Sequence, residues 1–139
     1  MSEIVVGYDG SDGSRAALDT AIDLAQKLGD SVTVVFGDAA PGVVGGEMSS
    51  HEAAVRERGE QVMKLATDQA SAKKFEVETK LINELAVDAL IAQAESAGAD
   101  MIVVGNQGGP SPLKGAILGA VPFKLVHLSP VPVLVVPSA

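Results

Sequence analysis

Residues 103–121 read VVGNQGGPSPLKGAILGAV, which is the end of an apolar strand, a glycine-rich loop and the first residues of a helix. Pro122 supports a helix start at this point, because proline is favoured in the first helical turn and breaks a helix interior. The unpaired N–H groups of such a turn attract anions, so the stretch predicts an anion site beside a strand end. Glycine-rich turns after buried strands are also common, so an ordinary turn is the alternative. Close backbone approach is allowed at five glycines, Gly105, Gly108, Gly109, Gly115 and Gly119.

The rest of the chain alternates strands with helices. Two of the strands are apolar on both faces, as in parallel strands covered by helices. We expect strands at residues 4–6, 31–36, 75–82, 101–104 and 130–137, and helices at residues 16–28, 51–72, 87–97 and 120–128. Ser11 or Asp12 is expected to cap the first helix, and Gly29 to close it. The pattern predicts a three-layer, doubly wound α/β sandwich of five mostly parallel strands in the order 3-2-1-4-5, with helices on both faces.

Length and composition limit the possible classes of protein. The 139 residues suit one domain, residues 1–139. A formal net charge of -8 argues against duplex DNA and anionic membranes as partners. The absence of cysteine excludes disulfides, thiolate nucleophiles and cysteine-ligated zinc. Neither a signal sequence nor an apolar run long enough to cross a bilayer is visible, so we expect a cytoplasmic protein with no nucleic-acid or membrane partner.

Three residues that follow expected strands can converge at one edge of the sheet. Asp9, Gly37 and Gly105 each come directly after a strand, and doubly wound sheets bind ligands at the carboxyl ends of their strands. Asp9 equally fits an ordinary turn whose carboxylate caps the next helix. The connection at residues 37–50 is longer than usual and can close over a ligand.

Four stretches together form a specific signature: IVVGYDGS at residues 4–11, ADMIVVG at 99–105, GAV at 119–121 and PVPVLVV at 130–136. The loop lacks both the Walker pattern, since Gly115 follows Lys114, and the GxGxxG dinucleotide fingerprint. Instead, essentially the whole chain resembles the universal stress protein family, a family of small α/β domains of which one branch binds ATP.

In the ATP-binding branch the loop reads G-x2-G-x9-G followed by Ser or Thr. In this chain Gly108 has the correct spacing from Gly105, but ten residues instead of nine separate it from Gly119. Gly109 is separated from Gly119 by the correct nine residues, but it lies one residue too far from Gly105. Ala120 occupies the position of the Ser or Thr hydroxyl. Losing a hydrogen bond to a charged group weakens binding by about ten- to a hundredfold. The sequence is therefore compatible both with ATP binding and with its loss.

The resemblance implies a role for individual residues. Asp9 would contact the ribose, the backbone near Gly37 the adenine, and backbone amides near Ala120 the phosphates, with magnesium or manganese carried by the phosphates. Lys114 is either a compensating charge or a solvated loop lysine. The full set of expected ligand-binding residues is Gly7, Asp9, Gly37, Val104, Gly105, Gly108, Gly109, Lys114, Gly119, Ala120 and Val121.

The last strand predicts a homodimer. Val131 to Val136 form a short apolar segment bracketed by prolines, which suits an edge strand that needs a cover. The resemblance implies that this strand forms a dimer, and cover by the chain's own helix is the alternative.

Three functions remain open from the sequence. The first is stress-response regulation by ATP or another adenine nucleotide, the second is a protein-interaction or scaffold role without nucleotide, and the third is slow ATP hydrolysis. No catalytic or metal-ligating constellation is visible: His51 and His127 lack ligand spacing, and the pairs Asp19 with Asp23 and Glu84 with Asp88 suit a solvated surface.

Overall fold

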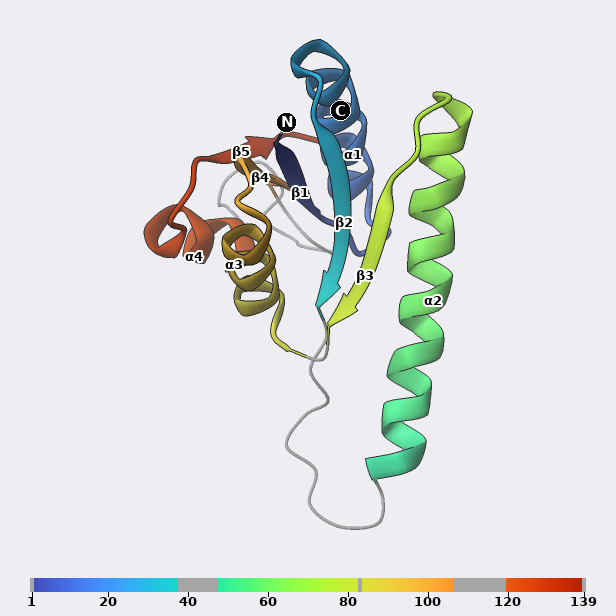
Figure 1. The fold of residues 1–139 in the computed structure, drawn as a ribbon. Coiled ribbons are helices and arrows are strands. Elements are labelled where there is room, and N and C mark those ends of the chain that lie inside the picture. The colour runs from blue at the N-terminus through green and yellow to red at the C-terminus, as the bar shows by residue number, and fades with distance from the viewer. Residues whose placement is uncertain (1, 38–47, 83, 107–119, 139) are drawn as a thin grey trace.

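The computed structural model describes residues 2–37, 48–82, 84–106 and 120–138, and its centre is a five-stranded sheet (Figure 1). The strands lie in the order β3-β2-β1-β4-β5, and every neighbouring pair is parallel. The predicted fold class and strand order are therefore confirmed. The strands are β1 Glu3–Gly7, β2 Ser31–Gly37, β3 Glu78–Ile82, β4 Met101–Gly105 and β5 Val133–Val136.

Helices cover both faces of this sheet. One layer contains α1 Asp12–Leu28 and α2 Met48–Ala72, and the other contains α3 Ala86–Ala97 and α4 Ala120–Leu128. Successive side chains of a strand point to opposite faces. Ile4 and Val6 accordingly pack with α1 and α2, whereas Val5 packs with α3 and α4, and all three are fully buried. None of the helices in the described ranges is long and apolar enough to cross a membrane.

The ends of α1 follow the sequence signals. Ser11 is the N-cap, and its hydroxyl oxygen accepts a hydrogen bond from the backbone N–H of Ser14 at 3.3 Å. Gly29 closes the helix with φ 75° and ψ 26°, a left-handed conformation that glycine adopts without a Cβ clash. Of the two predicted caps, Ser11 is therefore the one that the chain uses.

Several element boundaries differ from the prediction, among them the start of α1, at Asp12 instead of residue 16, and the start of β5, at Val133 instead of residue 130. Helix α2 begins at Met48 instead of residue 51, and Gly37 is the last residue of β2 instead of the first residue of a loop. Strand β3 begins at Glu78 and not at residue 75. Phe75 and Val77 pack against the core without pairing to β2, so their alternation reflects burial and not a ladder.

The two halves of α2 differ in burial. In its carboxyl half, Val62, Met63, Ala66 and Ala70 are buried against the sheet and α1. The amino half extends past the carboxyl end of β3 (Figure 1), and its described side chains before Gly59 are all exposed. Among the side chains of α2 that the structure describes, those anchored in the apolar core therefore belong to the carboxyl half.

Polar contacts also anchor the carboxyl half of α2 to α1. The Gln69 amide donates to Asp19 Oδ1 at 2.8 Å, and Lys73 Nζ lies 2.9 Å from Asp23 Oδ1 and 3.8 Å from Asp19 Oδ1. These groups are largely exposed, so each ion pair contributes little to stability. The predicted carboxylate pair on α1 is thus occupied by a lysine of the neighbouring helix.

Candidate functional site

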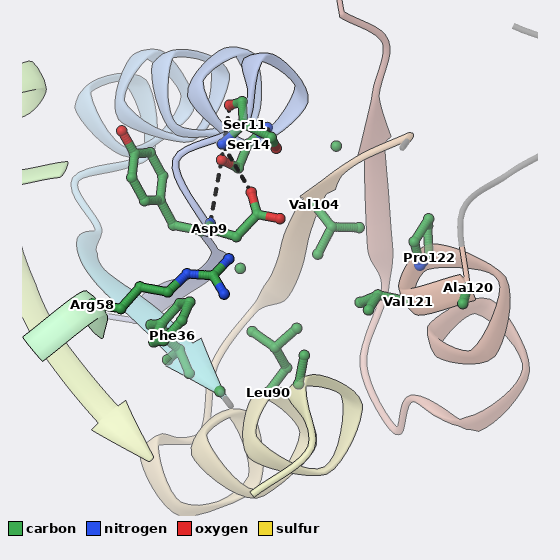
Figure 2. A pocket seen from close by; sticks show the side chains of 16 residues that line it. Asp9, Ser11, Ser14, Phe36, Arg58, Leu90, Val104, Ala120, Val121 and Pro122 are labelled. Atoms are coloured by element: carbon green, nitrogen blue, oxygen red, sulfur yellow. Dashed lines mark hydrogen bonds between the residues drawn. The ribbon is translucent and has the colours of Figure 1, made fainter. Parts of the chain in front are cut away.

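A cavity of about 390 Å³ opens at the carboxyl ends of β1, β2 and β4 (Figure 2). This volume falls within the ~300–1,000 Å³ that is typical of small-molecule sites. All four helices contribute to its walls. The lining residues are Gly7, Tyr8, Asp9, Ser11, Ser14, Val35, Phe36, Gly37, Arg58, Ala86, Leu90, Val104, Gly105, Ala120, Val121 and Pro122.

Asp9 is held in place by the turn between β1 and α1. Its Oδ1 accepts a hydrogen bond from the backbone N–H of Ser11 at 2.9 Å. The backbone N–H of Asp9 donates to Ser14 Oγ at 3.3 Å, and that hydroxyl donates to the Ser11 carbonyl at 3.0 Å. The turn function predicted for Asp9 is thus present. An ionised carboxylate offers about four acceptor sites, so Asp9 can also accept from a ligand's hydroxyl groups.

The β4 end of the cavity is formed by backbone in very close contact. A Cβ atom placed on Gly105 would lie 2.5 Å from the carbonyl carbon and 2.7 Å from the carbonyl oxygen of Gly13 in α1. No side chain fits between these two segments. The strand end therefore stays directly beside the start of α1, and Gly105 leaves main chain on the cavity surface.

Helix α4 points its amino end into the cavity. Ala120 and Val121, the first two residues of the helix, both line it, and Pro122 follows in the first turn. The first amides of a helix have no carbonyl partner within that helix, and they coincide with the positive end of the helix dipole. Proline lacks an N–H, so among the cavity-lining residues of α4 Ala120 and Val121 supply the donors of this turn. Such an end can bind a phosphate or another anion.

The end of β2 and α3 form an apolar wall of the cavity. A Cβ atom on Gly37 would lie 2.9 Å from Ala86 Cα and 2.9 Å from Ala89 Cβ, so the glycine lets α3 pack directly against the strand. Leu90 and Phe36, both buried, complete this wall. Apolar surface of this kind is suited to a planar ring with little charge.

Arg58 of α2 also lines the cavity, although the sequence analysis did not select it. Its side chain extends from α2 toward Asp9 and Phe36 (Figure 2). Among the described residues, no ion pair includes the Arg58 guanidinium. In the sequence, Arg58 lies next to Gly59, a residue of the face that packs on the sheet, but it also belongs to a run of charged residues typical of a solvent-exposed face.

Tyr8 lies at the back of the cavity with 3 % of its surface exposed. Burial raises the pKa of the Tyr8 hydroxyl, because the charged phenolate would lose its hydration. The hydroxyl donates to Gln69 Oε1 at 3.0 Å. Tyr8 therefore connects β1 to α2 as a neutral hydrogen-bond donor.

The full length of the chain matches one protein family. A sequence model of the universal stress protein family matches residues 1–137. The chain belongs to the universal stress protein family. This identification agrees with the fold and with the position of the cavity in a doubly wound sheet.

Individual universal stress proteins resemble the chain over nearly its whole length. Universal stress protein YxiE of Bacillus subtilis (strain 168) is 30% identical, and the alignment covers 98% of this chain and 99% of the relative. A universal stress protein solved in complex with cAMP is 28% identical, with a TM-score of 0.72 and coverage of 99% of this chain and 98% of the other. UspA of Lactobacillus plantarum shares the fold at a TM-score of 0.84, 18% identity and 97% coverage of both chains.

The residues expected from the universal stress protein pattern fall into two groups. Four of them, Gly108, Gly109, Lys114 and Gly119, lie outside the described residues, as do residues 38–47 of the long connection. The other seven all line the cavity: Gly7, Asp9, Gly37, Val104, Gly105, Ala120 and Val121. Beyond these, the structure adds Arg58 and the turn serines Ser11 and Ser14.

Proposed function

We propose that this universal stress protein is a cytoplasmic regulator that binds an adenine nucleotide, with ATP as the regulatory ligand, in the cavity at the carboxyl edge of the sheet. The observation that carries the proposal is the arrangement of three different walls around one cavity. The helix α4 amides suit phosphates, Asp9 suits ribose hydroxyls, and the wall of Gly37, Ala86 and Leu90 suits a base. The related protein solved with cAMP supports this choice of ligand class.

The residues present fit such a nucleotide. Asp9 lies across the cavity from Leu90 of the apolar wall, and α4 borders a third side, so a ribose at Asp9 could connect a phosphate at α4 to a base at the apolar wall (Figure 2). A magnesium or manganese ion would enter with the phosphates, since Asp9 is the only carboxylate that lines the described part of the cavity. Rapid hydrolysis needs a base positioned to activate water. Asp9, the only carboxylate in the described lining, instead accepts a hydrogen bond within the turn, so we assign the nucleotide a regulatory role. Magnesium-dependent phosphate release well above background would contradict this assignment.

Direct titration tests the proposal. We expect the wild-type protein to release or absorb heat when ATP is added in a calorimeter. We expect GTP to bind more weakly, because the apolar wall offers no hydrogen bond to the carbonyl and amino groups of guanine. Absence of ATP, AMP and adenosine binding would reject the nucleotide function. The scaffold function, supported by the strand edge discussed below, would then remain.

Serine at position 120 is expected to tighten ATP binding. Ala120 is exposed at the first helical residue and lines the cavity, so a serine hydroxyl there could donate to a phosphate in addition to the backbone amide. A hydrogen bond to a charged group predicts an improvement of about tenfold. Calorimetry of Ala120→Ser with ATP and with adenosine measures it, and adenosine, which has no phosphate, should bind as before. Equal ATP affinity of both proteins would place the phosphates away from α4.

We also propose that two copies of the chain pair through β5. This strand is an edge of the sheet, and Val133, Leu134 and Val135 are only partly buried. An apolar edge with unpaired backbone groups needs a cover. The same surface supports the second candidate function, an interaction or scaffold protein that acts without nucleotide.

Lysine at position 134 is expected to convert the dimer into a monomer. The charge would lie within the proposed contact, where it would lose hydration on association. Size-exclusion chromatography with light scattering measures the mass, and circular dichroism verifies that the variant is folded. Thr79→Lys is the matched control, because it adds the same charge to the opposite edge strand, β3. A folded Leu134→Lys protein with the mass of a dimer would refute pairing through β5.

A further inference from the structure

Arg58 has an unusual position for a charged residue of α2. Its backbone belongs to the amino half of the helix, which extends beyond the sheet, yet its side chain turns back to line the cavity (Figure 2). Arg56 carries the same charge and is exposed like Arg58, but it does not line the cavity. The two exposed arginines therefore differ in where their side chains lie: Arg58 lines the cavity and Arg56 does not.

The order of the cavity walls indicates which part of a nucleotide Arg58 would meet. This step rests on the proposed function. If the phosphates lie at Ala120 and Val121 and the ribose at Asp9, the base occupies the remaining side, beside Gly37 and Leu90. Arg58 is on that side, next to Phe36, whereas α4 forms the opposite wall (Figure 2).

We infer that the Arg58 guanidinium stacks on the face of the bound purine base, which is thereby enclosed between α2 and the wall formed by β2 and α3. A guanidinium is planar and weakly hydrated, and it stacks on aromatic rings more readily than an ammonium does. Stacking of bases on planar side chains is a general way to bind them without hydrogen-bond readout. Arg58 is thus a positioning residue for the base, and its charge also offsets that of Asp9 within the described lining.

Two substitutions separate planarity from charge. Arg58→Lys keeps the charge and removes the plane, whereas Arg58→Tyr keeps a plane and removes the charge. For adenosine, which has no phosphate, we expect Arg58→Lys and Arg58→Ala to bind about two- to fivefold more weakly, and Arg58→Tyr to bind like the wild type. Arg56→Ala is the matched control for loss of one positive charge on the same helix, and it should leave adenosine affinity unchanged.

Calorimetric titration of each variant with adenosine, AMP and ATP completes the test. Stacking predicts that Arg58→Lys loses the same factor for all three ligands. A loss that is absent with adenosine and grows with the number of phosphates would overturn the inference, because it would identify Arg58 as a phosphate contact. Unchanged affinities in Arg58→Ala would also overturn it while leaving the nucleotide function intact. Failure of the wild type to bind any of the three ligands would overturn both.

Discussion

Alanine at position 105 is expected to destabilise the protein by about 3 kcal/mol, because it places a methyl group inside a backbone contact. The new Cβ would lie 2.5 Å from the carbonyl carbon of Gly13 and 2.9 Å from its Cα. These are main-chain atoms of a helix that is packed on the sheet through Ala17, Leu18 and Ala21, all fully buried. Relief of the overlap therefore requires α1 to move as a whole. Urea denaturation followed by circular dichroism measures the loss.

Gly7→Ala is the matched control for this substitution. Gly7 also lies at a strand end and lines the cavity, but its added Cβ would meet Leu90 Cδ1 at 3.0 Å and Val104 Cγ1 at 3.1 Å. Ends of side chains can adjust by a few tenths of an ångström, so we expect a loss nearer ~1 kcal/mol. If both variants unfold at the same urea concentration, the backbone contact between Gly105 and Gly13 can open at little cost, and our prediction for Gly105→Ala is wrong.

Asparagine at position 9 is expected to weaken adenosine binding by about tenfold or more, because a charged acceptor for the ribose hydroxyls is lost. Asparagine is chosen over alanine because its side-chain oxygen can still accept the hydrogen bond that Ser11 donates at 2.9 Å. The turn should thus persist, and the change in affinity should report on the ligand contact. Adenosine is the better probe than ATP, since removal of a negative charge also favours the binding of phosphates.

A pair of ligands identifies the contact of Asp9. If Asp9 accepts from the 2′-hydroxyl of the ribose, Asp9→Asn should lose less affinity for 2′-deoxyadenosine than for adenosine, because that hydroxyl is already missing. The affinities of the wild type and of Asp9→Asn for the two nucleosides form a double-mutant cycle in which one of the two changes is made in the ligand. Equal losses for both nucleosides would show that Asp9 makes no contact with the 2′-hydroxyl group.

The fold was predictable because its signals are local and repeated. Strands that are apolar on both faces, a capping serine at Ser11 and a closing glycine at Gly29 each agree with the structure. The predicted boundaries were less accurate where alternating residues are buried without pairing to a neighbouring strand, as at Phe75 and Val77. Tertiary packing decides such positions, and a local pattern does not contain it.

The site was predictable where its residues follow strands directly. Asp9, Gly37 and Gly105 reach one cavity because parallel strands end at the same edge of the sheet. Arg58 comes from α2, a helix that passes beside this edge. The direction of its side chain depends on how α2 packs on β3 at Gly59, where an added Cβ would lie 1.9 Å from Leu81 Cδ2. The spacing of residues within one helix does not reveal how that helix packs against a strand distant in the sequence.

The strand order has a consequence for synthesis on the ribosome. The innermost strand, β1, is made first, and its two neighbours are made at very different times: Ile4 pairs with Val32 on one side and with Met101 on the other. A nascent chain that has not yet reached β4 therefore carries a strand with three successive apolar residues, Ile4 to Val6, and one open side. Open apolar strands promote association with other chains. Translation that pauses before residue 101 would leave this protein at its most aggregation-prone, even though β1, β2 and β3 are already complete.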